Sequence, residues 1–476
     1  MSAPPHATAT PTPVQRRTIA AWSAWDWGSA AWNAVITTFV FTTWLTSSAF
    51  APTDIAEQAA NTSDPGHATA KLEVAGIIAT HTTWLSWGTA LAGLAIALIA
   101  PVLGARADAG GRRKLWLGIN TTAVVILSML LFFVTPDQEN LSGNVVLGIV
   151  ILAAGNIFFE LASVNYNAML NQISTPTNRG RISGIGWGAG YLGGIVLLVI
   201  VYFGLVEPEV GVFGITGENG LDIRVAVLFS ALWFAAFAIP VFRAVPEQPS
   251  VATVPPTIMA SYRKVGADIA RLWRTDRTTL RFLFSAAIYR DGLAGVFLYG
   301  GILASGTFGF TSGEVILFAI GANVVSGIAT IVFGFLEDRV GARLVIIGSL
   351  LGMIVSGLVV FLGHNGGPTI FWIFGLMLCI FVGPVQSASR STVSRLATPT
   401  TEGELFGLYA MTGRVVSFLA PLSFGVMVAI FDEQRFGILG LIAILAVGLV
   451  LVWPLNLMGR DRSTAHRAPI ERHITD

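Results

Sequence analysis

Long apolar runs are the feature that most limits what this chain can fold into. Twelve such runs follow one another between residues 20 and 457, and a helix that crosses a bilayer needs about 20 apolar residues. We therefore predict an all-α, multi-pass membrane protein. The runs occupy residues 20–46, 74–103, 115–135, 144–166, 184–206, 222–244, 281–303, 313–336, 344–363, 369–389, 404–431 and 436–457.

The composition supports this class and argues against several others. Only 12% of the 476 residues are charged and 54% are hydrophobic, whereas about 25% of the residues of soluble domains are charged. The net charge of +1 and the lack of a basic domain argue against a nucleic-acid partner. Cys379 is the single cysteine, so the sequence predicts no disulfide framework and no thiolate metal site. We expect a monomer surrounded by lipid, without a cofactor or a bound metal.

The runs divide into six and six around a polar segment. We predict a disordered tail at 1–18, a six-helix bundle at 19–244, a linker at 245–280, a second bundle at 281–457 and a tail at 458–476. In the linker, apolar residues recur at helical spacing from Met259 to Leu272. This pattern indicates an amphipathic helix on the membrane surface or a solvated linker helix.

The distribution of basic residues predicts which side of the membrane each loop faces. With the N-terminus inside, only Lys71, Arg224 and Arg435 of the 28 Lys and Arg residues fall in outer loops. Arg290 and Arg414 lie within runs, and the others lie at the inner side. Since cytoplasmic loops are enriched in Lys and Arg, we expect both termini in the cytoplasm and the protein in the cell membrane. The first 17 residues lack the apolar core of a signal peptide.

The two halves of the chain share loop motifs. The pattern G-x3-D-x2-G-x-R occurs at 104–113 and again at 334–343, 230 residues later. "STPTNRGRISG" at 174–184 and "ATPTTEGELFG" at 397–407 share Thr-Pro-Thr, Gly and Gly at an offset of 223. Two motifs in register indicate duplication, and parallel repeats of this kind occur in one large class of transporters.

The loop "GARADAGGRRK" resembles the signature loop of the major facilitator superfamily, although Ala109 stands where a basic residue is usual. Within that superfamily the chain resembles the vacuolar amino-acid effluxer family and its bacterial relatives. The motifs that carry this resemblance are "WDWGSAAWN", "NYNAML", "GAGYLGG", "YRDG", "VQSASRS" and "LFGLYAMTGR". The resemblance implies two pseudo-symmetric six-helix bundles that rock around a central site. For the fungal relatives it implies amino-acid export from the vacuole.

Charged and polar residues inside the runs are the candidates for substrate binding or proton coupling. A charge at the centre of a spanning helix costs about 2.5–3.5 kcal/mol, so such residues are read as functional. Arg414 is the candidate for clamping a substrate carboxylate, since guanidinium binds carboxylate in a bidentate manner. Arg290 and Asp291 point about 100° apart on a helix, so each is expected to pair elsewhere. The candidates are Asp26, Glu160, Asn165, Tyr166, Asn167, Arg290, Asp291, Gln386, Arg390 and Arg414.

Alternatives remain open at several of these positions. Asp26 is expected to face a water-filled cavity, but its neighbours Trp22, Trp25 and Trp27 also suit an aromatic belt at the membrane surface. Glu160 is a proton-coupling candidate or one partner of a structural ion pair. The side chains of 165–167 bind a polar solute or form hydrogen bonds between helices. Gly186, Gly190 and Gly194 recur every four residues, which indicates close helix packing rather than a phosphate loop.

The repeat also predicts a gate on the inner side. The loop after the second run should meet the start of the eleventh run, and the loop after the eighth should meet the start of the fifth. Thr401 and Glu404 have the spacing of a capping box, so Arg112 and Arg113 are expected to pair with Glu402 and Glu404, and Asp338 with Arg179 and Arg181. Both contacts should form when the inner side is closed. The gate residues are Gly104, Asp108, Arg112, Arg113, Arg179, Arg181, Asp338, Arg343, Glu402 and Glu404.

Three classes of function fit these residues. The first is a secondary transporter of a small polar solute, such as an amino acid, coupled to protons because carboxylates and arginines share the membrane interior. The second is a flippase or exporter of a lipid or lipid-linked substrate. The third is a membrane receptor that transports nothing. An enzyme is not expected, since no nucleophile–base pair stands out.

Overall fold

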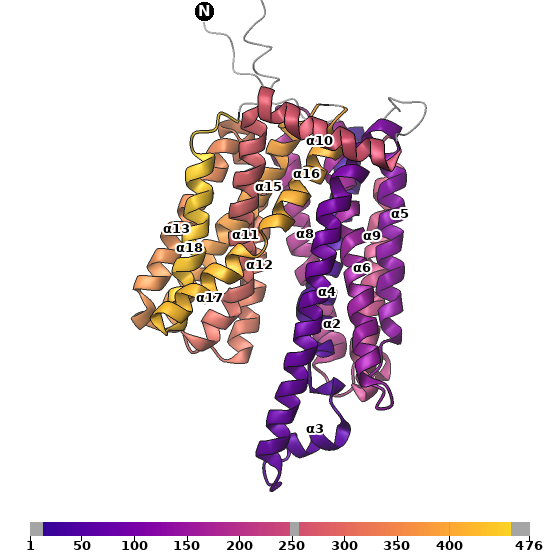
Figure 1. Cartoon of the computed structure of the whole chain (residues 1–476), viewed down its shortest axis with the longest axis vertical. Helices are drawn as coiled ribbons and strands as arrows, with labels where there is room; N and C mark the ends of the chain where they lie inside the picture. The colour runs from indigo at the N-terminus through magenta and orange to yellow at the C-terminus, as the bar shows by residue number, and fades with distance from the viewer. Residues whose placement is uncertain (1–12, 248–256, 399, 458–476) are drawn as a thin grey trace, which may run out of the picture.

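Two helical bundles lie side by side and are joined at one end by a surface helix (Figure 1). The computed structural model describes residues 13–247, 257–398 and 400–457. Within these ranges the chain is helical, apart from loops and one isolated bridge between Val210 and Thr216. The expected tail at 458–476, most of the tail at 1–18 and linker residues 248–256 lie outside the described ranges.

The N-terminal half runs from α1 to α9. Its main helices are α1 (Pro13–Ala31), α2 (Phe41–Leu45), α3 (Thr53–Ala60), α4 (His67–Gly110), α5 (Arg113–Leu130), α6 (Leu141–Ala168), α7 (Leu170–Ile173), α8 (Arg179–Val201) and α9 (Leu221–Ala244). The π-helical stretches η1 (Trp32–Phe39) and η4 (Tyr202–Val206) continue α1 and α8. Since α1 begins at Pro13, part of the segment predicted as a tail is helical.

The linker helix and the C-terminal half follow. They comprise α10 (Ile258–Thr275), α11 (Arg277–Gly306), α12 (Ser312–Val340), α13 (Ala342–Leu362), α14 (Pro368–Ile370), α15 (Leu376–Leu396), α16 (Glu402–Val416), α17 (Leu419–Phe431) and α18 (Gly437–Val452). The π-helical stretch η8 (Phe371–Gly375) joins α14 to α15. Short 3-10 turns occur at Ser48–Phe50, Leu131–Phe133, Val212–Gly214, Glu218–Gly220, His364–Gly366 and Gln434–Phe436.

Eleven helical segments in the described part are long and apolar enough to cross a membrane. They correspond to eleven of the twelve predicted runs. The first run, 20–46, is helical but divided into α1, η1 and α2, with Val40 between the last two. The eleventh run is also divided, because α16 ends at Val416 and α17 begins at Leu419. Breaks and π-helical stretches in a helix often mark functional regions.

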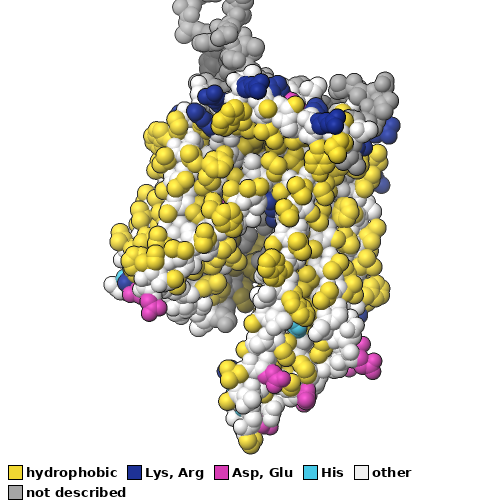
Figure 2. Space-filling model, viewed as in Figure 1, with side chains coloured by type: hydrophobic (Ala, Val, Ile, Leu, Met, Phe, Trp, Pro, Cys, Tyr) yellow, Lys and Arg dark blue, Asp and Glu magenta, His cyan; other side chains and the backbone are white. Residues whose placement is uncertain are grey.

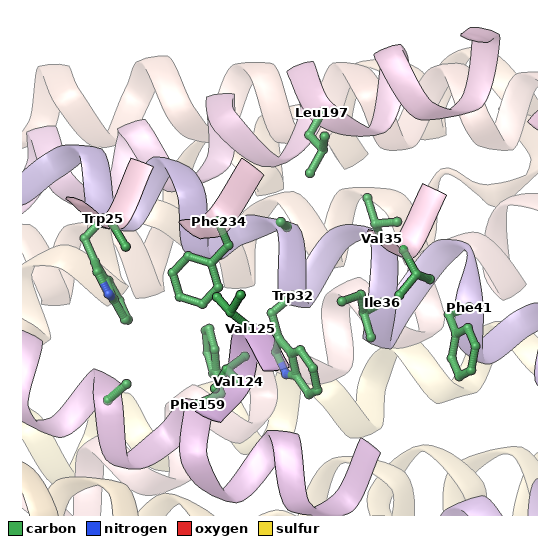
Figure 3. Packing of buried hydrophobic residues seen from close by; sticks show 14 of the residues in the cluster. Trp25, Trp32, Val35, Ile36, Phe41, Val124, Val125, Phe159, Leu197 and Phe234 are labelled. Carbon is green, nitrogen blue, oxygen red and sulfur yellow. The ribbon is translucent and has the colours of Figure 1, made fainter. Parts of the chain in front are cut away.

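Trp25 of α1 and Trp32 of η1 lie in the core of the N-terminal half (Figure 3), and Trp22 belongs to the same buried cluster. Trp22, Trp25 and Trp32 are each at most 1% exposed. The Trp25 ring is 6.3 Å from that of Phe159 and 5.6 Å from that of Phe234, measured between centroids. The aromatic-belt interpretation is therefore wrong for Trp22 and Trp25, since their rings contact α6 and α9 rather than lipid headgroups.

The two halves contact each other most closely where α4 meets α16 and where α8 meets α12. Both contacts lie toward the end of the molecule that carries α10, which we call the α10 end. Two further contacts join residues exactly one repeat apart: Asn171 donates to the Ser394 carbonyl at 3.1 Å, and Arg390 donates to Asn167 at 3.3 Å. Their separation of 223 residues matches the offset of the second loop motif. Equivalent positions of the two halves therefore face each other across an approximate twofold axis.

The linker helix α10 lies across both halves and uses its apolar face against protein (Figure 1). Val265 is buried, and Ile269 and Leu272 pack against the same hydrophobic cluster. The Tyr262 hydroxyl donates to the Leu98 carbonyl of α4 at 3.3 Å, while Lys264 pairs with Glu404 of α16. Burial alone would lower the pKa of Lys264, but the carboxylates of Glu404 and Asp268 outweigh it, and the net effect is a raised pKa. The helix thus ties α4 to α16.

Cysteine labelling in intact cells tests the predicted orientation. Arg263 is exposed on α10 and Asp54 is exposed on α3 at the opposite end, whereas the native Cys379 is buried. We expect a membrane-impermeant maleimide to label Asp54→Cys at once and Arg263→Cys only after permeabilisation. The unsubstituted protein should stay unlabelled. Labelling of Arg263→Cys in sealed cells would contradict the predicted orientation and place α10 on the outer side.

Candidate functional site

An ion pair between Asp26 and Arg390 joins the two halves. Asp26 lies in α1 and Arg390 in α15, and Asp26 Oδ2 is 3.0 Å from Arg390 Nη1. The Arg390 side chain is 3% exposed and the Asp26 side chain is 16% exposed. An unpaired charge at this depth is costly. The ion pair lowers the free-energy cost of burying both side chains. Asp26 therefore faces a counter-ion in the opposite half.

The other nitrogens of Arg390 are also held by the N-terminal half. Its Nε donates to Ser183 Oγ at 3.0 Å, and its Nη2 donates to the Ser183 carbonyl at 2.6 Å. Nη1 also donates to Asn167 Oδ1 at 3.3 Å. The Ser183 hydroxyl in turn donates to the Ser387 carbonyl of α15 at 2.8 Å. A guanidinium of the C-terminal half is thus bound by α1, α6 and α8 together.

Aromatic rings fix the orientation of the Asp26 carboxylate. Tyr166 stacks between Trp22 and Trp25, with centroid distances of 4.5 and 4.3 Å, and its hydroxyl donates to Asp26 Oδ2 at 2.8 Å. Arg390 Cζ lies 4.8 Å from the centroid of the Trp22 ring, within cation–π range. The candidates Asp26, Tyr166 and Arg390 therefore form one assembly.

Gly186 leaves the space in which this pair forms. A Cβ at this position would lie 2.8 Å from both Arg390 Nη2 and Asp26 Oδ2. Farther along α8, a Cβ at Gly190 would contact Asp26 O at 3.5 Å, and one at Gly194 would contact Ala30 Cβ at 3.2 Å. The glycine face of α8 thus packs on α1.

A second ion pair, Glu160–Arg414, also crosses between the halves. Glu160 of α6 and Arg414 of α16 approach to 3.0 Å, and their side chains are 20% and 28% exposed. This pair is more accessible than the first. Arg414, predicted to bind a substrate carboxylate, already holds a carboxylate of the protein.

Arg290 of α11 lies against Tyr409 of α16. Its Cζ is 3.9 Å from the centroid of the Tyr409 ring, and its Nη1 donates to the Tyr409 carbonyl at 3.3 Å. Tyr409 also interacts electrostatically with Arg390 and Glu160, one member of each ion pair. The Tyr289 hydroxyl is 2.6 Å from that of Ser389, which extends the polar groups toward α15.

Asp291 does not join this group, in contrast to the prediction of a shared cavity. Its Oδ2 accepts the backbone N–H of Ala420 at 2.6 Å, at the start of α17 and next to Pro421. A helix start leaves N–H groups without intrahelical partners, so the carboxylate stabilises the break between α16 and α17. The residue is 8% exposed.

Asn165 and Gln386 also differ from the prediction. The Asn165 side-chain amide donates to the Leu161 carbonyl of its own helix at 2.8 Å, so it contributes nothing to the Arg390 assembly. Gln386 is half-buried on α15, one turn before Arg390. Of the "NYN" motif, Tyr166 and Asn167 are the residues that reach the charged pair.

A hollow separates the two halves at the end opposite α10 (Figure 2). On the face shown, Lys and Arg gather at the α10 end and Asp and Glu at the opposite end. The partial exposure of Glu160, Arg414 and Asp26 fits a cleft between the halves that is closed toward the α10 end. We call this space the central cleft.

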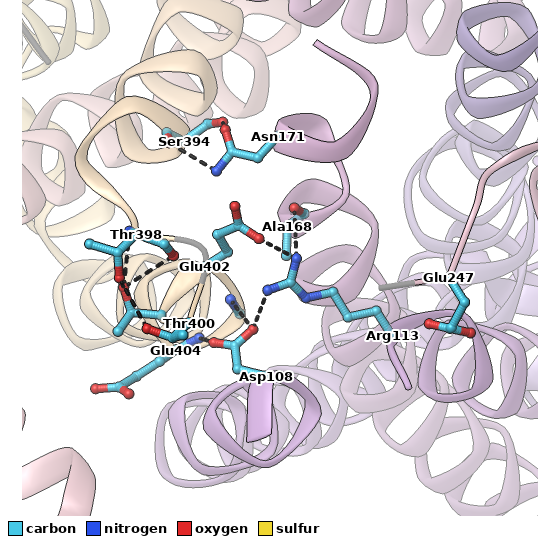
Figure 4. A network of polar contacts seen from close by, with 12 residues as sticks. Asp108, Arg113, Ala168, Asn171, Glu247, Ser394, Thr398, Thr400, Glu402 and Glu404 are labelled. Atoms are coloured by element: carbon cyan, nitrogen blue, oxygen red, sulfur yellow. Dashed lines mark hydrogen bonds and ion pairs between the residues drawn. The ribbon is translucent and has the colours of Figure 1, made fainter. Parts of the chain in front are cut away.

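At the α10 end, Asp108 caps the start of α16 (Figure 4). Its carboxylate oxygens accept the backbone N–H groups of Gly403 and Glu404, each at 2.9 Å. The predicted capping box is wrong, since the Thr401 side chain makes no cap bond and binds Thr398 instead. The acid that complements the helix start comes from the other half.

Asp338 repeats this arrangement at the start of α8. Its oxygens accept the N–H groups of Gly180 at 2.9 Å and Arg181 at 3.2 Å. Two equivalent aspartates thus cap two equivalent helices across the interface. Asp338 was expected to pair with the side chains of Arg179 and Arg181, but its hydrogen bonds come from the backbone N–H groups of residues 180 and 181.

Arg113 supports the Asp108 contact from the N-terminal half. It is 1% exposed, lies 2.5 Å from Asp108 Oδ1 and also pairs with Glu402. Arg112 is exposed, and Glu404 pairs with Lys264 rather than with Arg112. The Arg113–Glu402 pair is the one expected, whereas Glu404 differs from the expectation because α10 reaches over α16 and supplies Lys264.

Two gate candidates, Arg343 and Arg179, make hydrogen bonds within their own halves, while Arg181 Cζ lies 5.6 Å from the centroid of the Phe335 ring of α12. Arg343 donates to the Trp453 carbonyl at 2.6 Å, and Arg179 donates to Ser174 Oγ at 3.2 Å. Glu337, which the sequence reasoning missed, is 1% exposed and binds Arg395 at 3.0 Å as well as Ser391. Its position directly before Asp338 of the loop motif was the sequence feature that could have identified it as a gate residue.

Glycines allow the two halves to approach at this end. A Cβ on Gly104 would overlap the Gly403 carbonyl group, and one on Gly334 would lie 2.9 Å from the Gly180 carbonyl oxygen. Gly104 and Gly334 are equivalent residues of the two loop motifs. The first glycine of each copy of the repeated pattern is therefore where the backbones of the two halves come into contact.

Comparison with known proteins identifies the family. Residues 14–465 match the family model described as "Vacuole effluxer Atg22 like". The chain belongs to this family. The resemblance noted from the motifs is thereby confirmed, and the relatives of this Atg22-like chain are transporters rather than enzymes.

Relatives and solved structures agree with this assignment. The uncharacterized MFS-type transporter YxiO of Bacillus subtilis is 24% identical over 434 residues, covering 90% of this chain and 93% of YxiO. Autophagy-related protein 22 of Cryptococcus neoformans is 24% identical over 302 residues, covering 59% of this chain but only 50% of that protein. The structure of the E. coli fucose:proton symporter FucP matches with a TM-score of 0.63 and 15% identity, covering 92% and 98% of the two chains. The predicted major facilitator fold is confirmed.

In this Atg22-like chain, Tyr409, Ser183 and Trp22 contact the charged residues but were not predicted. Tyr409 lies in "LFGLYAMTGR" and Trp22 precedes "WDWG", so both were near a motif. Ser183 offered no signal of its own, because a serine inside a glycine-rich helix is also common in packing. Only the fold shows that its hydroxyl meets Arg390.

A single methyl group at Gly104 should prevent closure of the α10 end. Because the added Cβ overlaps Gly403, Gly104→Ala should push α4 away from α16. A cysteine at Ser394, which is 1% exposed, should then react with a small maleimide at least about tenfold faster, as expected when about 1.4 kcal/mol of closed-state stability is lost.

Gly76→Ala is the matched control, since Gly76 lies on the same helix as Gly104 and a Cβ there would meet nothing within 4 Å. It should leave the labelling rate unchanged. Equal labelling rates in the Gly104→Ala and unsubstituted backgrounds would show that the Gly104–Gly403 contact does not hold the end closed.

Proposed function

We propose that this chain is a secondary active transporter that moves a small polar solute by alternating access. The observation that carries the proposal is the pair of ion bridges, Asp26–Arg390 and Glu160–Arg414, each joining one half to the other. Figure 2 shows a hollow between the halves at the end opposite α10, and the partial exposure of these side chains supports a position beside it. Groups that hold two rigid bodies together at a central cleft are also the groups that a bound solute can rearrange.

The contacts at the α10 end suit a reversible closure. Asp108 and Asp338 each accept two backbone N–H groups from the other half, and a capping contact of this kind contributes about 0.5–2 kcal/mol. Bonds of this size can break together within the energy that a solute and an ion gradient supply. The structure described here then corresponds to the state with the α10 end closed.

We propose that Asp26 couples transport to protons. A proton on Asp26 would remove the attraction that holds Arg390 Nη1 at 3.0 Å, while Ser183 and Asn167 would still bind the guanidinium. The neutral carboxyl could then separate from Arg390 when the halves move. The accessible Asp26 side chain, 16% exposed, supports proton exchange with the cleft.

The Lys and Arg distribution supports a proposal for the membrane and the orientation. We propose the cell membrane, with both termini and α10 in the cytoplasm, so that the central cleft opens to the outside. The family name refers to efflux from the vacuole, and an amino acid is one solute that this relationship suggests. We propose a monomer, since each half finds its partner in the same chain.

Transport in proteoliposomes tests the proposal. With an imposed pH gradient, the protein should accumulate at least one solute from a mixture of labelled amino acids and simple organic acids. Asp26→Asn should reduce gradient-driven accumulation at least about tenfold but retain solute exchange without a gradient, because only the proton-binding group is lost. Glu160→Gln should impair both, since it leaves Arg414 unpaired.

Asp54→Asn is the matched control, because Asp54 is exposed on α3 and distant from the cleft residues in the fold. Normal gradient-driven accumulation by Asp26→Asn would contradict the coupling assignment. Movement of a labelled phospholipid, with no solute uptake, would favour the flippase alternative instead. Since loss of one partner of a buried pair costs about 3–5 kcal/mol, folding of each variant is checked by its thermal unfolding.

A further inference from the structure

The linker helix α10 carries a second apolar stripe, beside the face that packs on the two halves. The stripe consists of Met259, Tyr262, Gly266, Ala270 and Trp273, which recur every three or four residues and so share one side of the helix. Its three large side chains are 64%, 42% and 66% exposed. The stripe lies roughly 100° around the helix from the buried Val265. A row of large apolar groups that the protein leaves uncovered marks an interaction surface.

This stripe adjoins the lipid-facing surface of α4. The Tyr262 hydroxyl donates to the Leu98 carbonyl at 3.3 Å, and Leu98 lies roughly three turns, or about 18 Å, before the end of α4 at Gly110. The side chains of Leu91, Leu94 and Leu98 are 64%, 59% and 55% exposed on a segment that is long and apolar enough to cross a membrane. Tyr262 therefore reaches residues of α4 that suit contact with lipid chains.

Basic residues border the stripe on the side of α10 that faces away from the protein. Residues 258–281 contain six basic and only two acidic residues, and Asp268 is already paired within α10. Arg263 and Arg274 are exposed roughly 60–80° from the stripe, and no ion pair recorded in the described part of the chain includes either of them. Figure 2 shows Lys and Arg along the α10 end, with apolar side chains directly below them. The helix thus presents positive charge next to an apolar strip.

Arg277 and Trp273 lie together at the end of α10. Arg277 Nε donates to the Trp273 carbonyl at 3.1 Å, and its Cζ is 5.9 Å from the centroid of the Trp273 ring. Trp and Tyr rings favour the headgroup level of a membrane, where lipid phosphates lie. A cation held beside such a ring therefore has an anionic partner within reach at that level.

We infer that α10 docks on the membrane surface and binds anionic phospholipids through Arg263, Arg274 and Arg277, and that this contact holds the α10 end closed. Amphipathic helices with a basic side bury their apolar side at the headgroup boundary and gain affinity from anionic lipids. The inference concerns a lipid partner and does not depend on which solute is carried.

The lipid contact acts on closure because α10 also bridges the two halves. Tyr262 binds α4, and Lys264 pairs with Glu404 of α16. When α4 and α16 separate, α10 has to release one of them. A helix held on the lipid surface beside α4 cannot follow α16, so opening then breaks the Lys264–Glu404 pair. A lipid that binds α10 in this position favours the closed state, since a ligand stabilises the state that it binds better.

Spin labels on α10 test where the stripe lies. In the full-length protein in lipid nanodiscs, a label at Met259→Cys should collide more often with oxygen, which dissolves in lipid, than with a water-soluble nickel chelate. A label at Ala267→Cys, exposed about 80° farther around the helix, is the matched control and should show the opposite preference. Cys379 is buried and should take up no label. If Met259→Cys prefers the nickel chelate, the stripe lies in water and the inference is overturned.

Nanodiscs of two compositions test the role of lipid charge. One contains phosphatidylcholine alone, and the other contains equal parts of phosphatidylcholine and phosphatidylglycerol. Ser394→Cys, buried at the closed end, should react with a small maleimide at least about fivefold more slowly in the anionic discs, the effect of about one basic residue at an anionic surface. Equal rates in the two lipids would overturn the inference.

Two pairs of substitutions assign the lipid effect to α10. Arg263→Gln with Arg274→Gln should bring the two rates within about twofold of each other, because the main lipid contacts are lost. Arg243→Gln with Arg339→Gln removes the same charge from exposed positions in the last turns of α9 and α12 and should keep the full difference. A difference that survives in the α10 pair, or disappears in both pairs, would contradict the assignment.

These measurements need no solute, so they separate the lipid site from the proposed transport. Loss of the lipid effect would overturn the lipid site and leave the transport function standing. A full lipid effect in a protein that moves no solute would overturn the transport function and leave the lipid site standing.

Discussion

Charges buried within the bilayer need partners, and in this protein the partners lie in opposite halves. Asp26 of the N-terminal half is held by Arg390 of the C-terminal half, and Glu160 is held by Arg414. Each half alone would leave costly charges uncovered. The two bundles are therefore joined at the centre by electrostatic complementarity, and Gly186 supplies the space in which the deeper pair forms. The rest of the architecture places α1, α6, α15 and α16 so that these groups meet.

Closure at the α10 end relies on a different interaction. Asp108 and Asp338 bind backbone N–H groups at the starts of α16 and α8, and glycines let the helices approach. Because each acid binds backbone, the contact depends little on which side chains the opposite helix carries. The linker helix adds Lys264 to Glu404, so the closed end also includes a contact from the segment between the halves.

The sequence predicted the twelve runs, the duplication and the places where the halves meet, because hydropathy and repeated loop motifs are local signals. Of the pairs between helices it predicted Arg113–Glu402, but it did not predict most of the others. Arg414 was expected to await a substrate but holds Glu160, and Asp291 was expected in the cleft but caps α17. Thr401 and Glu404 had the spacing of a capping box, yet Asp108 from the other half occupies that helix start. In each case a tertiary partner replaced the partner that sequence spacing suggested.

The central claim is that the two ends of the molecule open in alternation. It is tested by distances between spin labels in bilayers: one pair at Arg112 and Thr400 at the α10 end, and another at Glu139 and Asp432 at the opposite end, all exposed positions. The account predicts that Asp108→Asn combined with Asp338→Asn lengthens the first distance and shortens the second. If both distances lengthened together, or if only the first changed, the two ends would not be coupled and alternating access would be contradicted.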